Sequence, residues 1–153
     1  MPHSFPVRDT GAPALLCPAT LTDAALMQGV LTVLSDQQLA SVAIMLTEET
    51  QRRLMNAITT EIRAAVTRAV EERETDSPAP VVRAQFRVRD TDSMPPYWDG
   101  TDATLRHTDG RSTRHLDTSD TRLEELLNDF TCVKQPSARS VLTIDLRTGG
   151  FHY

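Results

Sequence analysis

The sequence predicts an α+β domain of two layers, in which helices pack on a mostly antiparallel sheet of about five strands with one inserted helix. Two observations about aromatic residues support this. None occurs between Phe5 and Phe86, and aliphatic, Ala-rich stretches favour helices. The others, from Phe86 onward, all lie in the second half, and aromatics favour strands. Helix-capping signals in the first half of the chain and alternating apolar residues in the second half support the same fold class.

Residues 1–19 carry four prolines and one glycine, so a flexible N-terminal arm is expected there. Residues 20–153 then form one domain, with a helical part over 20–75 and a sheet part over 81–153. The arm lacks a basic stretch followed by an apolar one, which argues against a signal peptide. The longest nearly apolar run, Val42–Leu46, is far shorter than the roughly 20 residues of a membrane span.

Three helices are expected within the helical part. A cap at Thr20–Asp23 begins the first, which runs to about Leu34. Ser35-Asp-Gln-Gln38 has the form of a capping box and begins the second. Two glutamates after Thr47 suit the first turn of a third helix, over 48–74. The alternative is one continuous helix over 36–74, which at 1.5 Å per residue would be about 60 Å long. We favour a break near Thr47.

The clearest strand follows the proline-rich linker 76–80. Four apolar residues alternate with four polar ones, as in a half-buried strand. The apolar set is Val82, Ala84, Phe86 and Val88, and the polar set is Arg83, Gln85, Arg87 and Arg89. A loop over 90–100, containing Pro95 and Pro96, is expected next.

A hairpin is expected around Asp109-Gly110, which favours a two-residue turn. That turn pairs Leu105 with Arg114. One face then holds Ala103, Leu105, His107 and Leu116, and the other holds Thr104, Arg106, Arg111, Thr113 and His115.

A helix over 121–131 and a C-terminal hairpin complete the fold. Thr121 and Glu124 form a capping box, and an apolar stripe follows at Leu123, Leu126, Leu127 and Phe130. A turn at Gly149-Gly150 places Leu142, Ile144, Leu146, Phe151 and Tyr153 on one face. Asp145, Arg147 and His152 fall on the other face.

Motifs of catalysis and metal binding are missing from the sequence. It has no nucleotide-binding glycine loop, zinc-protease motif or hydrolase elbow. Cys17 and Cys132 are too few and too far apart for a CxxC site. His107 and His115 fall on opposite faces and cannot share a metal. Asp90-x-Asp92 begins like a calcium loop, but Pro95 and Thr101 occupy the places of its glycine and glutamate. We therefore expect no cofactor, no metal and no enzyme.

Arginines dominate the predicted outer face of the sheet. The net charge of −5 excludes a wholly basic nucleic-acid-binding protein but not a local basic patch. The candidate binding residues are Arg83, Arg87, Arg89, Arg106, Arg111 and Arg147, with His115 and His152 beside them. Lys134 is the only lysine, whereas the chain has 15 arginines, and this imbalance is typical of proteins from a GC-rich bacterial genome. Such a composition also favours a simple solvated face.

Tyr97-Trp98 is the second candidate binding element. Two aromatics in a loop suit a partner-binding anchor, although covering the end of the core is the more common role. The sequence therefore predicts a small non-enzymatic cytoplasmic protein, binding or regulating another protein as immunity proteins, antitoxins and accessory subunits do. No membrane contact is expected, and a homodimer is compatible. One alternative is a nucleic-acid-binding accessory protein using the arginine face. Another is an enzyme using His115 or His152 with Asp145.

Overall fold

The computed structural model describes residues 23–117 and 121–153. It confirms the α+β class, with a five-stranded antiparallel sheet of order β3-β2-β1-β4-β5. The expected arm over 1–19, the beginning of the first helix and Cys17 lie outside the described residues. The chain forms two compact units, Met1–Met45 and Leu46–Tyr153.

Helix α2 spans Ala24–Val33 and follows the expected cap. The Asp23 carboxylate accepts hydrogen bonds from the backbone N–H groups of Ala25 and Leu26, at 2.9 and 3.1 Å. These bonds satisfy donors that the first turn of a helix leaves without partners.

Helix α3 spans Asp36–Glu71 without interruption, so the predicted break near Thr47 is wrong. The capping box at its start is confirmed, since Ser35 and Gln38 each bond the other's backbone N–H. No glycine or proline interrupts these 36 residues. Glu49 does not begin a new helix but pairs with Arg52 and Arg53 one turn further on.

Strands β1 (Val81–Thr91) and β2 (Met94–His107) form one long hairpin. The predicted loop over 90–100 is therefore wrong, because both strands continue through most of it. Residues 94–101 of β2 pair only with β1, since β3 joins β2 at Asp102 and beyond. Pro95 and Pro96 are tolerated there because an edge strand does not need their missing N–H groups.

Strand β3 (Ser112–Asp117) follows a three-residue loop rather than the predicted two-residue turn. Gly110 closes this loop with φ of 83°, a left-handed conformation that favours glycine. The extra residue pairs Leu105 with Thr113 instead of Arg114. Thr113 is therefore buried on the core face, not exposed on the outer face as predicted. The side chains of Arg114, His115 and Leu116 lie outside the description.

Helix α4 (Thr121–Val133), strand β4 (Val141–Asp145) and strand β5 (Phe151–His152) complete the fold. The C-terminal turn is longer than predicted, because Asp145 already bonds Gly150 across it. Phe151 pairs with Ile144 and packs against the core with it, as predicted, but the prediction for Tyr153 is wrong because it is 46% exposed.

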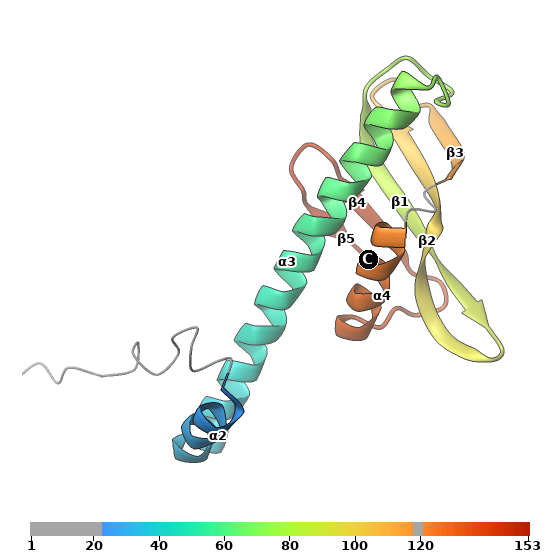
Figure 1. Cartoon of the computed structure of the whole chain (residues 1–153). Helices are drawn as coiled ribbons and strands as arrows, with labels where there is room; N and C mark the ends of the chain where they lie inside the picture. The colour runs from blue at the N-terminus through green and yellow to red at the C-terminus, as the bar shows by residue number, and fades with distance from the viewer. Residues whose placement is uncertain (1–22, 118–120) are drawn as a thin grey trace, which may run out of the picture. The chain divides into compact units, whose positions relative to one another are not determined.

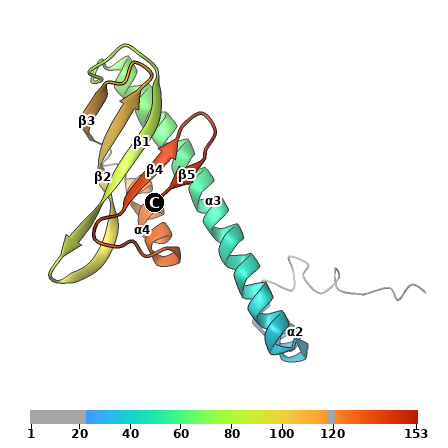
Figure 2. The ribbon, with the colours of Figure 1, turned by 180° about the vertical axis from the view of Figure 1, so that it is seen from behind.

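Helices α3 and α4 cover the same face of the sheet (Figure 1). The core joins Met55, Ile58 and Ile62 of α3 to the buried stripe of α4 and the inward residues of the strands. All four predicted stripe residues are buried: Leu123, Leu126, Leu127 and Phe130. Figure 2 views the sheet from its other side, where neither helix covers it.

Candidate functional site

The outer face of the sheet aligns polar side chains in rows across neighbouring strands. Inward residues such as Ala84 and Phe86 are fully buried, so their neighbours along β1 point outward. Strand pairing gives one row of Ser112, Arg106, Arg83 and Asp145. The next row contains Thr104, Gln85, Thr143 and His152.

Arg83 and Arg106 lie opposite each other on β1 and β2. Neither forms an ion pair with a carboxylate among the residues that the structure describes. The guanidinium of Arg106 instead donates to the hydroxyl of Ser112 at 2.6 Å and to the Gln85 carbonyl at 3.5 Å. Gln85 in turn donates to the Thr143 hydroxyl at 3.2 Å. Neutral groups therefore hold Arg106 in place without cancelling its charge.

Asp145 of β4 lies opposite Arg83 in the strand pairing, but its carboxylate binds other groups. It accepts hydrogen bonds from the backbone N–H groups of Thr148 and Arg147, at 3.0 and 2.9 Å. These bonds lower the pKa of Asp145 below its usual value. The carboxylate thus stabilises its own turn and leaves Arg83 unpaired.

Arg87 is the third arginine of this face, exposed and opposite Val141. A shallow depression of about 230 Å³ separates Arg87 from Arg106. Its other walls are Gln85, Thr104, Val141 and Thr143. We call Arg83, Arg87, Arg106 and this depression the arginine face.

The other three predicted arginines each have an acidic partner. Arg89 lies 2.8 Å from Asp99, and this carboxylate, with the Tyr97 hydroxyl, raises the pKa of Arg89. Arg111 lies in the β2–β3 loop, 3.8 Å from Asp109. Arg147 lies in the β4–β5 turn, 3.8 Å from Asp145. The predicted patch of six is therefore reduced to three unpaired arginines.

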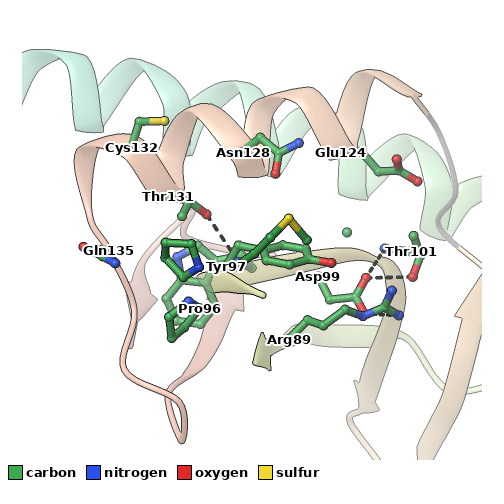
Figure 3. Close-up of a pocket in the computed structure, with 14 residues that line it drawn as sticks. Arg89, Pro96, Tyr97, Asp99, Thr101, Glu124, Asn128, Thr131, Cys132 and Gln135 are labelled. Carbon is green, nitrogen blue, oxygen red and sulfur yellow. Dashed lines mark hydrogen bonds and ion pairs between the residues drawn. The ribbon is translucent and has the colours of Figure 1, made fainter. Parts of the chain in front are cut away.

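Tyr97 and Trp98 lie in β2, where they border a cavity of about 720 Å³ (Figure 3). Trp98 is only 1% exposed, so it belongs to the core and is not an exposed anchor. Its backbone N–H donates to the Thr131 hydroxyl of α4 at 3.3 Å. Tyr97 is half-buried beside Pro96 at the open side of the cavity.

Helix α4 supplies the opposite wall of this cavity, which the sequence reasoning missed. Glu124, Asn128, Thr131 and Cys132 of α4 line the cavity, and Thr131 points toward β2 (Figure 3). A polar stripe at this helical spacing, opposite the apolar stripe of α4, is the signal that identifies such residues. Cys132 is a free, exposed thiol, and no histidine lines the cavity with it. The cavity therefore lacks the histidine that usually activates a thiol nucleophile.

His107 has a structural role. It is 3% exposed, and its two ring nitrogens lie 2.8 Å from the carbonyl oxygen of Ala79 and 2.8 Å from the hydroxyl of Thr113. Because the Ala79 carbonyl can only accept, Nδ1 carries a proton. The Thr113 hydroxyl also accepts from the N–H of Asp76, at 3.0 Å. These contacts join the linker before β1 to the β2–β3 hairpin.

The predicted pair of His152 and Asp145 is not assembled in the described residues. His152 is exposed on β5, and no hydrogen bond joins it to Asp145. The side chain of His115, which was the alternative partner of Asp145, lies outside the described residues. Across 23–117 and 121–153, no three His, Cys, Asp or Glu side chains gather closely enough to hold a metal ion.

Comparisons with known proteins identify no family for this chain. No protein-family model matches the chain, and no curated protein or solved structure is significantly similar to it. In the described part of the chain, no helix has both the length and the apolar character that crossing a membrane requires.

Proposed function

We propose that this protein is a non-enzymatic binding protein whose arginine face docks a carboxylate-rich segment of another protein. The observation that carries the proposal is the opposition of Arg83 and Arg106, with no carboxylate paired to either in the described structure. The proposal includes the cytoplasmic location expected from the sequence, where a thiol such as Cys132 stays reduced.

Opposed arginines favour an external ligand over a simple solvated face. Like charges directly opposite each other in a sheet are destabilising. A bound carboxylate would remove that repulsion, because a guanidinium can donate two parallel hydrogen bonds to one carboxylate. Ser112 and Gln85 hold the Arg106 side chain across the face, which reduces the side-chain entropy lost on binding.

The chemistry around the arginine face favours protein over nucleic acid. None of the residues that line its depression is aromatic, so bases would have nothing to stack on. A second depression of about 430 Å³ adjoins it, and its lining includes Asp90, Asp99 and Asp102 as well as Arg87 and Arg89. This mixed charge suits a continuous phosphate backbone less well than a short acidic segment that contacts only the arginine face.

Photo-crosslinking in the cells of origin tests the proposal. A photoreactive residue replaces Thr104, at the centre of the arginine face, or the exposed Thr60 of α3 as a control. We expect position 104, but not position 60, to crosslink to one partner peptide rich in Asp and Glu.

Charge reversal decides whether the arginines hold that partner. Arg87→Glu with Arg106→Glu should abolish the crosslink from position 104. Arg52→Glu with Arg53→Glu, an equal charge change at exposed sites on α3, should retain it. Emission from the buried Trp98 reports that each variant is folded. A crosslink to nucleic acid, no crosslink, or one that survives the charge reversal would overturn the proposal.

A further inference from the structure

We infer that the segment Ala24–Met45 is a self-association surface, which pairs with the same segment of a second copy of this chain. It consists of α2, the connection after it and the first ten residues of α3, and it lies in the compact unit Met1–Met45. The inference is independent of the arginine face.

This segment is apolar but contains no buried side chain. Fourteen of its 22 residues are Ala, Val, Leu, Ile or Met. Helix α2 has no buried residue, and the buried residues of α3 begin only at Met55. The most exposed large side chains are Val33 at 73%, Ile44 at 59%, Met45 at 57% and Leu26 at 55%. Contiguous exposed apolar residues of this kind mark interaction surfaces.

Two helices of this composition require a second layer to bury their apolar sides. The corresponding pair from a second copy supplies it, since two helical pairs related by a two-fold axis make a four-helix bundle. The 22 residues of the segment are enough for a dimer interface, because stable interfaces use roughly 20–30 residues on each side.

The charge distribution selects a second copy as the occupant. Asp36 is the only charged residue of the segment, and no Lys or Arg occurs between Arg8 and Arg52. A two-fold interface brings identical patches together, so a nearly uncharged surface avoids self-repulsion. Anionic lipid surfaces and nucleic acids are bound through cations, which the segment lacks. A strongly charged protein partner would find no complementary charge on it.

Sedimentation equilibrium of the full chain tests the inference. We expect wild type to be a dimer at micromolar concentration and Val33→Glu with Ile44→Glu to be a monomer. Val70→Glu is the matched control, since Val70 is 53% exposed on the same helix but lies outside the segment. It should remain a dimer. Unchanged Trp98 emission in the double variant would show that the sheet and its core remain folded.

Site-specific crosslinking provides a second readout. In a chain with Cys17→Ser and Cys132→Ser, Ile44→Cys should crosslink one copy to another, and Val70→Cys should not. A monomeric wild type, or a dimer that survives the double substitution, would overturn the inference. So would a wild type that is monomeric in solution and floats with phosphatidylcholine vesicles through Val33 and Ile44, because the occupant would then be a lipid surface.

Discussion

Arg83 of β1 lies directly opposite Arg106 of β2, and neither is ion-paired with a carboxylate of the described structure. The neighbouring arginines behave differently, since Arg89 pairs with Asp99 and Arg147 approaches Asp145. The arginine-rich composition of the chain accounts for these basic residues being arginines, but it does not explain why two of them are opposed. Because like charges directly opposite each other in a sheet are destabilising, we expect this opposition to lower the stability of the free protein.

Arg83→Thr should stabilise the free domain relative to Arg87→Thr. Both substitutions place the same β-favouring residue on the same face of β1, but only the first removes an opposed arginine. We expect the free energy of unfolding to differ by about 0.2–1 kcal/mol, the usual size of a cross-strand pair term. Urea unfolding measures the difference. Equal stabilities would mean that Arg83 and Arg106 do not repel each other.

Thr113→Val should destabilise the domain, because it removes the partner of both His107 and the Asp76 N–H. Leaving buried polar groups unsatisfied costs about 1–3 kcal/mol. Thr104→Val makes the same change on the outer face and should alter stability by less than about 0.5 kcal/mol. Comparable losses in the two variants would contradict the structural role assigned to His107.

Gly100→Ala should force α4 away from β2. An added Cβ would lie 3.2 Å from the Glu124 Cα and 3.1 Å from the Leu127 side chain. The first neighbour is backbone and cannot rotate aside, so we expect a loss of about 1–3 kcal/mol, as for an overpacked core. The denaturation midpoint checks this, and a wild-type midpoint would show that α4 does not approach β2 so closely.

Glu49 should titrate well below an ordinary glutamate. Hydrogen bonds from Arg52 and Arg53 lower its pKa from 4.5 to about 2. Since the folded pKa is depressed, this stabilisation of α3 is fully present above pH 4.5 and is lost as the pH falls toward 2. Carboxyl NMR measures the pKa, which should return toward 4.5 in Arg52→Gln with Arg53→Gln. An unchanged pKa in that variant would contradict the assigned cause.

Local periodicity was sufficient to predict much of the core. The stripe of α4 and the alternation of β1 depend only on neighbouring residues, so Leu123, Phe130 and Phe86 are buried as predicted. Register was less predictable, because a single added loop residue at Gly110 moved Thr113 to the core. The sequence pattern also could not show that Pro95 lies on an edge, which depends on the length of β3.

The candidate site was predictable in part for the same reasons. Strand alternation alone places Arg83, Arg87 and Arg106 on the outer face. The ion pair that distinguishes Arg89 from them depends on Asp99, ten residues away, and on a side-chain distance of 2.8 Å that no periodicity encodes. The wall that α4 contributes to the cavity beside Tyr97 requires the packing of two elements distant in sequence.

The most direct test of the arginine face is an NMR titration of the isotope-labelled protein with a glutamate-rich peptide. The account predicts that the largest amide shifts occur at residues 83–87, 104–106 and 143, that they weaken with added salt, and that they vanish in Arg87→Glu with Arg106→Glu. Shifts confined to the cavity lined by Tyr97 and Asn128, or shifts unchanged by the charge reversal, would contradict it.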